Sequence, residues 1–126
     1  MNEPFLQFAA SDLLAERSRW LESLKTERRL SEKTLDAYER DLRQFLQFLT
    51  GYYGKPPCIK DVADLRPMDL RGFLAERRRD GAGARTIGRG IAGIRSFIRF
   101  LERKGLASSA GLAATNTPKQ PKTLPK

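Results

Sequence analysis

The segment RTIGRGIAGIRSFIRFLERKG, residues 85–105, decides the fold class of this chain. It contains GRGIAG, residues 88–93, which matches the G-x-G-x-x-G pattern of dinucleotide-binding loops. That pattern requires a buried strand before it and an acidic residue about 20 positions after it. The preceding ERRRDGAGAR is too charged for a buried strand, and the later stretch LASSAGLAA holds no acid. A dinucleotide-binding loop is therefore excluded.

The same segment has the apolar spacing of an amphipathic helix. Its large apolar residues recur every three or four positions, which places them on one side of a helix: Ile87, Ile91, Ile94, Phe97, Ile98 and Leu101. Each glycine costs about 1 kcal/mol relative to alanine inside a helix. Gly90 and Gly93 flank the apolar side and predict the close approach of a neighbouring helix. Gly88 lies on the other side, where it would admit a nucleic-acid backbone. Simple tolerance of glycine is the alternative for all three.

The opposite side of this helix is basic. A projection at about 100° per residue places five arginines there, with only Glu102 near their edge: Arg85, Arg89, Arg95, Arg99 and Arg103. Residues 85–126 hold nine basic side chains and one acidic side chain, whereas residues 1–84 are nearly balanced. Because arginine donates forked hydrogen bonds to phosphate and to guanine, this side predicts a polyanionic partner. An ordinary solvated basic surface is the alternative.

Composition excludes several kinds of function. The chain has 126 residues, a net charge of +9, no histidine and one cysteine, Cys58. The length suits one domain with a modest core. The lack of histidine removes the commonest general base and zinc ligand, so we expect no catalytic residue, metal or cofactor. A single cysteine allows no internal disulfide. No apolar run is long enough to span a membrane, and no signal peptide is evident. A cytoplasmic protein is expected.

Two helices are predicted before residue 55. Ser11 or Asp12 is placed to cap a first helix that reaches about Glu27. Ser31 then caps the most strongly amphipathic stretch of the chain, SEKTLDAYERDLRQFLQFLTGYY, residues 31–53. Glycines at 51 and 54 and the prolines at 56 and 57 end this second helix.

A third helix and the overall architecture follow from the next segment. KPPCIKDVADL, residues 55–65, is expected to be a loop. Pro67 suits the first turn of a helix that ends in ERRRDG, with Gly81 as its stop. No stretch alternates as a strand does. The fold class is therefore all-α: a compact four-helix bundle over residues 11–105, with an N-terminal extension at 1–10 and a flexible, proline-containing linker at 106–126.

The second helix also has a polar side that suits DNA. Opposite its apolar side lie Lys33, Ala37, Arg40, Gln44 and Gln47. Arginine and glutamine read base edges in a major groove, and lysine and threonine hold phosphates. Thr34 lies beside the Ser31 cap, where a hydroxyl and a free backbone N–H would form an anion site. Ordinary surface polarity explains the two glutamines equally well. Tyr38 is expected in the core, with a hydroxyl that can reach the surface.

Three stretches together resemble a known family. These are LSEKTLDAYERDLRQFLQFL (30–49), LRGFLAERRRDGAGARTIGRGIAGIRSFIRFLERKG (70–105) and PKQPKTLPK (118–126). Their order and spacing are similar to the N-terminal half of Xer-type tyrosine recombinases, nearest the XerC branch. The resemblance implies a SAM-like core-binding domain that lies on one face of a recombination site, while an absent C-terminal catalytic domain beyond the 106–126 linker grips the other face.

The resemblance also implies where DNA is contacted. By motif match, Ser31, Lys33, Thr34 and Tyr38 fall at the DNA-facing start of the second helix. Arg85, Thr86 and Arg89 fall at the start of the last helix. The family's catalytic residues all belong to the C-terminal half. Its parent enzymes cut and rejoin DNA through a covalent tyrosyl-phosphate, and a XerC-like enzyme pairs with a XerD-like sister in a tetramer to resolve chromosome dimers at cell division.

The sequence thus predicts a DNA-binding, non-catalytic domain of a tyrosine recombinase. The residues expected to bind double-stranded DNA are Ser31, Lys33, Thr34, Tyr38, Arg40, Gln44, Arg85, Thr86, Arg89, Arg95 and Arg99. Two alternatives stay open. One is a helical module that docks an acidic protein partner, and the other is the DNA-binding domain of a mobile-element integrase.

Overall fold

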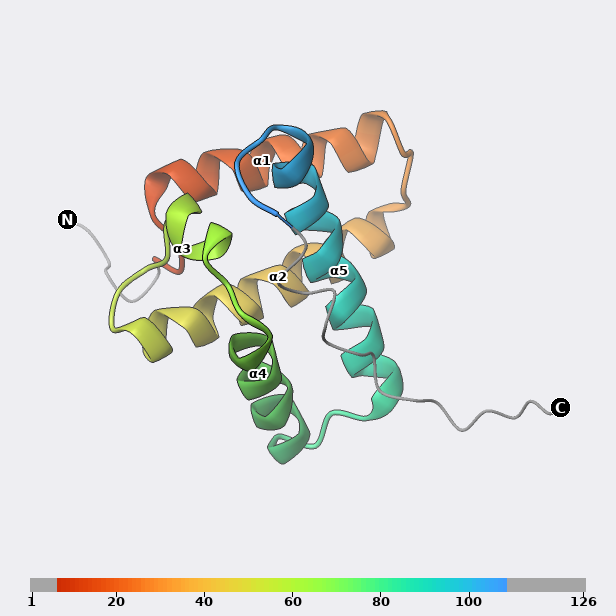
Figure 1. Ribbon diagram of the computed structural model, residues 1–126. Coiled ribbons are helices and arrows are strands. Elements are labelled where there is room, and N and C mark those ends of the chain that lie inside the picture. The colour runs from red at the N-terminus through yellow and green to blue at the C-terminus, as the bar shows by residue number, and fades with distance from the viewer. Residues whose placement is uncertain (1–6, 109–126) are drawn as a thin grey trace, which may run out of the picture.

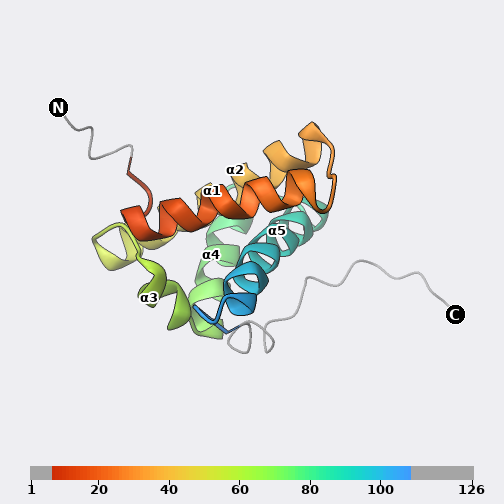
Figure 2. The same ribbon diagram turned by 90° about the horizontal axis from the view of Figure 1, so that it is seen from above.

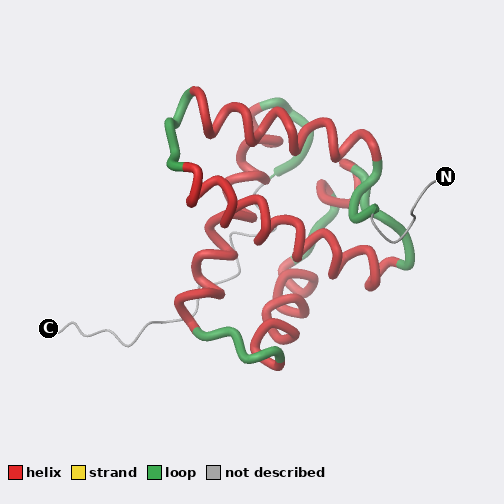
Figure 3. The backbone as a smooth tube through the Cα atoms, turned by 180° about the vertical axis from the view of Figure 1, so that it is seen from behind, coloured by secondary structure: helices red, strands yellow, loops and turns green. Residues whose placement is uncertain are grey.

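The computed structural model describes residues 7–108, and this part of the chain is all helical. The chain runs along α1 (Ser11–Thr26), turns back along α2 (Glu32–Tyr53), passes through the short α3 (Ile59–Ala63) and descends α4 (Pro67–Arg79) before returning along α5 (Ala84–Arg103) (Figure 1). The view from behind shows α5 crossing α2 (Figure 3). The all-α class is confirmed. Residues 1–6 and 109–126 lie outside the described part, so the extension and the linker stay predictions.

The ends of α1 and α2 follow local chemistry, with one correction. Ser31 caps α2 as predicted, because its Oγ accepts a hydrogen bond from the Thr34 N–H at 3.2 Å. Gly54, at φ 78°, ends α2 in the left-handed conformation that glycine adopts without cost. The predicted side-chain cap of α1 is wrong. Ala10 occupies the cap position, and the Asp12 carboxylate instead accepts from the backbone N–H of Ile59 at 3.3 Å.

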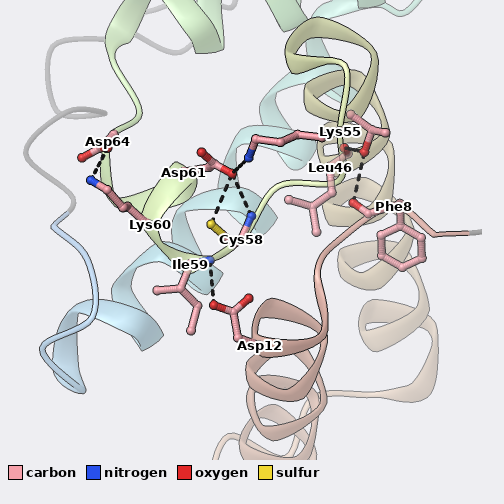
Figure 4. A network of polar contacts seen from close by, with 10 residues as sticks. Phe8, Asp12, Leu46, Lys55, Cys58, Ile59, Lys60, Asp61 and Asp64 are labelled. Carbon is pink, nitrogen blue, oxygen red and sulfur yellow. Dashed lines mark hydrogen bonds and ion pairs between the residues drawn. The ribbon is translucent and has the colours of Figure 1, made fainter.

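The five-residue helix α3 replaces part of the expected loop. Asp61 stabilises its start, because one carboxylate oxygen accepts from the Cys58 N–H at 3.0 Å and from the Lys55 ammonium at 2.6 Å (Figure 4). The same carboxylate accepts from the Cys58 thiol, and these contacts lower the pKa of Asp61, with the Lys55 bond as the main cause. A helix of this length has too few turns for apolar periodicity to predict it.

The boundaries of α4 and α5 agree closely with the sequence prediction. Pro67 begins α4, and Asp69 accepts from the Arg66 N–H at 2.9 Å, which caps the first turn. The chain leaves α4 through Gly81 at φ 94°. In α5 every residue of the predicted apolar side is buried: Ile87, Ile91, Ile94, Phe97, Ile98 and Leu101.

One hydrophobic core joins the helices, and α2 and α5 form its most extensive contact. Trp20 of α1 lies at the centre, where it packs edge-on against Phe97, and its indole N–H donates to Ser96 Oγ at 3.0 Å. Seen from above, α1 lies beside the later half of α5 (Figure 2). Lys104 closes that side through an ion pair with the buried Glu16 at 2.6 Å. The core therefore fixes the direction in which the outer sides of α2 and α5 point.

Replacing Gly90 by alanine is expected to stabilise the fold by about 0.5–1 kcal/mol, the difference in helix propensity. A Cβ atom at this position would lie 4.0 Å from the Asp41 carboxyl carbon, which is an ordinary contact. At Gly93 the added Cβ would lie 3.5 Å from the Tyr38 Cα, so the helices do approach closely there. Urea unfolding of Gly90→Ala, with Gly93→Ala as the tighter comparison, measures the effect. A loss of stability in Gly90→Ala would show that the packing requires glycine.

Candidate nucleic-acid interface

The outer side of α5 carries the largest group of arginines in the described fold. All five predicted arginines lie within roughly one third of the helix circumference, at about 100° per residue. Arg85, Arg99 and Arg103 are exposed and form no ion pair or side-chain hydrogen bond with any residue in 7–108. Arg95 is half-buried at the edge of this side. Exposed guanidinium groups without carboxylate partners are available to an anionic ligand.

Arg89 departs from the expectation of five arginines without carboxylate partners. Its Nε donates to Asp41 Oδ2 at 2.8 Å, and its Nη2 donates to Asp41 Oδ1 at 3.0 Å. The Asp41 side chain is 4% exposed and the Arg89 side chain 40% exposed, so the pair lies at the boundary of the core. The hydrogen bonds to Asp41 raise the pKa of Arg89 above its ordinary value. This forked pair joins α5 to α2, and that part of the prediction is corrected.

The outer side of α2 lies next to that of α5. Lys33 and Arg40 are exposed and form no ion pair with the described residues, and Gln44 is half-buried. Arg43 lies on the side of α2 that faces α1, because it shares the Glu39 carboxylate with Arg17 of α1. Burial raises the pKa of Glu39, but the hydrogen bonds from Arg17 and Arg43 outweigh it, so the net shift is downward. Lys33 and Arg40 are therefore the α2 cations that have no ion-pair partner among residues 7–108.

The start of α2 is less open than expected. The Thr34 N–H already donates to Ser31 Oγ, and the Ser31 hydroxyl donates to Thr34 Oγ1 at 3.0 Å. The helix start therefore satisfies this N–H itself, and of the Ser31–Thr34 pair the Thr34 hydroxyl is the group that can still donate to a ligand. Tyr38 is half-buried, and its ring lies parallel to that of Trp20 at 6.5 Å between centroids. Most of the Tyr38 side chain therefore packs within the fold, and only part of it is exposed at the surface.

Near the start of α5, Thr86 is half-buried and lines a small hollow with Asp41, Gln44 and Arg77. The structure therefore brings the α2 and α5 candidates onto adjacent sides of one helix pair. The sequence argument did not include Arg77 of α4, or Arg28 and Arg29 in the turn between α1 and α2. The run of arginines in ERRL was the available signal for the turn.

Among residues 7–108, no group of three or more acidic, histidine or cysteine side chains is placed to hold a metal ion. None of the described helices is long and apolar enough to cross a lipid bilayer.

Comparison with known families agrees with this architecture. Residues 18–105 match the model of the phage integrase N-terminal SAM-like domain, and the chain belongs to that family. Over its full length it is 64% identical to a tyrosine recombinase XerC of Rhizobium meliloti (strain 1021), of which it covers 39%. It is 62% identical over 99% of its length to a tyrosine recombinase XerC of Brucella suis biovar 1 (strain 1330), of which it covers 40%.

A more distant relative is a tyrosine recombinase XerC of Nitrobacter winogradskyi, 48% identical over 94% of the chain. The chain thus spans about two fifths of the length of these curated relatives. No solved structure gives a significant match. The resemblance to Xer-type tyrosine recombinases is confirmed at the level of sequence.

Proposed function

We propose that this chain is the DNA-binding N-terminal domain of a tyrosine site-specific recombinase. The observation that carries the proposal is the exposed basic side of α5. Arg85, Arg99 and Arg103 have no carboxylate partner there among residues 7–108, and α5 packs against α2, which carries Lys33 and Arg40. A helix fits the major groove, and a neighbouring helix can reach the phosphates that border it. Arginine supplies forked contacts to phosphate or guanine, lysine holds phosphate, and Gln44 would contact a base edge.

In this proposal the described fold binds and positions DNA but does not cut it. The parent enzyme cuts and rejoins DNA through a covalent tyrosyl-phosphate formed by residues that follow the linker at 106–126. It works in the cytoplasm in a tetramer with a XerD-like sister subunit, and it resolves chromosome dimers at cell division. The similarity to tyrosine recombinases XerC supports this assignment.

The proposal predicts DNA binding that weakens steeply with salt. With about four to six phosphates contacted, the logarithm of the association constant should fall with the logarithm of salt concentration at a slope near −4 to −5. Fluorescence anisotropy of a labelled random-sequence duplex between about 50 and 200 mM salt measures this slope. The affinity of the chain alone should be weak, because a clamp needs both halves. A chain that binds no duplex at low salt would refute the proposal.

The integrase domain of a mobile element is a second candidate, since the matching family model describes phage integrases. Both candidates share the same DNA-facing helices. They differ in the target site, so enrichment of bound duplexes from a random library distinguishes them. A chromosomal dimer-resolution site among the enriched sequences favours the first candidate, and the attachment site of a mobile element favours the second.

A further inference from the structure

A groove opens beside the basic side of α5, on the flank that faces α1. It lies between the last turns of α1, the turn that joins α1 to α2, the start of α2 and the later half of α5, and it has a volume of about 310 Å³. We call it the turn groove and define it by Arg28, Tyr38, Arg99 and Arg103, with Trp20 and Leu24 at its floor. The sequence prediction included no DNA contact from α1 or from the turn after it.

The rim of the turn groove is strongly basic. Arg28, Arg99 and Arg103 are exposed, and within residues 7–108 none of them has an ion-pair partner. Among the described residues that line this groove, Glu27 is the one with an acidic side chain. Cations that converge on a concave surface raise the local concentration of a polyanion, because low-dielectric walls focus their field.

The turn itself holds its next arginine in an uncommon backbone conformation. Arg29 has φ 54°, the left-handed conformation that usually belongs to glycine after a helix. The Leu30 N–H bonds to the Leu24 carbonyl at 3.1 Å, so the residue after Arg29 is tied back to the last turns of α1. The chain carries an exposed guanidinium where glycine would be the less strained choice. Strain of this kind points to a role for the side chain.

The floor of the turn groove argues against a protein partner. Stable protein partners usually bury a few anchoring side chains in a well-packed, desolvated pocket. Here Trp20 is 1% exposed and Leu24 3% exposed, so the core already covers the apolar atoms of both. Little apolar area is left for a partner to bury, whereas the rim carries three guanidinium groups that can each donate two hydrogen bonds to one phosphate. The surface therefore fits a phosphate backbone better than a peptide.

We propose that the turn groove is a second phosphate-binding site, which holds the DNA backbone beyond the α2–α5 surface with Arg28, Arg99 and Arg103, while the neighbouring exposed Arg29 contacts the same strand. This inference rests on the proposed DNA-binding function and extends the contact surface to the α1–α2 turn. The bound strand follows the later half of α5 and passes the turn, so the interface includes this turn as well as α2 and α5.

The main test uses the whole 126-residue chain with Arg28→Gln and Arg103→Gln combined. With a random-sequence duplex as the probe, the magnitude of the salt slope should fall by about 2, since each lost phosphate contact removes about 0.9. The affinity at low salt should fall at least tenfold. The matched control is Lys25→Gln with Arg71→Gln, which removes the same charge from exposed positions outside the turn groove and outside the α2–α5 surface. It should leave the slope nearly unchanged.

Arg29 provides a test that loss of folding cannot imitate. Arg29→Gly should raise the thermal midpoint, because glycine relieves the left-handed strain, and should weaken DNA binding at the same time. Arg29→Lys retains the charge and should retain most of the affinity. Opposite changes in stability and affinity support a direct contact, and a change in stability alone would contradict it.

The outcomes separate this inference from the function on which it rests. A wild-type chain that fails to bind duplex at low salt overturns both. Wild-type binding that Arg28→Gln with Arg103→Gln leaves unchanged overturns the turn groove alone. If the same variant loses binding to a poly-glutamate peptide but keeps its DNA slope, the groove is a site for acidic protein segments and the inference is wrong.

Discussion

Replacing Arg89 by alanine is expected to lower the free energy of unfolding by about 2–3 kcal/mol. The change leaves the Asp41 carboxylate, which is 4% exposed, without the two hydrogen bonds that compensate its charge. Removal of one partner from a fully buried pair costs about 3–5 kcal/mol. We expect less here because the Arg89 side chain is 40% exposed and water can reach part of the site. Urea unfolding followed by circular dichroism measures the loss.

Arg99→Ala is the matched control, because Arg99 lies on the same helix, is exposed and forms no ion pair with residues 7–108. It should change stability by less than about 0.5 kcal/mol. Combining Arg89→Ala with Asp41→Ala should recover part of the loss, since the uncompensated carboxylate is then absent. If Arg89→Ala and Arg99→Ala are equally stable, the Asp41–Arg89 pair does not hold α5 to α2.

The second large effect concerns DNA affinity. Combining Lys33→Gln, Arg40→Gln and Arg85→Gln should weaken binding to a random-sequence duplex about 100- to 1000-fold at low salt, because about three phosphate contacts are lost. The magnitude of the salt slope should fall by nearly 3. All three side chains are exposed and none is paired with a described residue, so stability should change little. Anisotropy titration measures the affinity, and thermal unfolding checks the fold.

The comparison variant is Lys25→Gln, Lys60→Gln and Arg71→Gln, which removes three charges from other exposed positions. Only the small contribution of net charge and the exposed Lys60–Asp64 ion pair, which adds little to stability, should change in that protein. Equal losses of affinity in the two variants would mean that overall charge, and not the α2–α5 surface, attracts DNA.

Sequence periodicity predicted the long helices because each repeats its pattern over several turns. The apolar side of α5 was predicted correctly, since six residues agree on one direction. The start of α2 was also predictable, because a serine cap acts on the backbone three residues away. The cap of α1 was not predictable, because the Asp12 carboxylate accepts a hydrogen bond from the backbone N–H of Ile59, which is distant in sequence.

The candidate site was only partly predictable for the same reason. The direction of the α5 arginines follows from helix geometry, but the partner of Arg89 lies 48 residues earlier in the chain. No local pattern indicates that Asp41, which lies beside the apolar side of α2, accepts that guanidinium. The basic surface at Arg28 likewise depends on the turn of the chain after α1, which brings it opposite Arg99. Both features require the packed fold.

The contact between α2 and α5 bears on the order in which this molecule folds. α1 and α2 are neighbours in sequence and in space, so their contact can form early. The α2–α5 contact joins segments far apart in the chain, so a longer loop must close before it forms. A chain that has formed only the α1–α2 contact would carry the arginines of α5 without the neighbouring helix that orients them. Recognition would then emerge late in folding, which keeps half-made protein from occupying DNA.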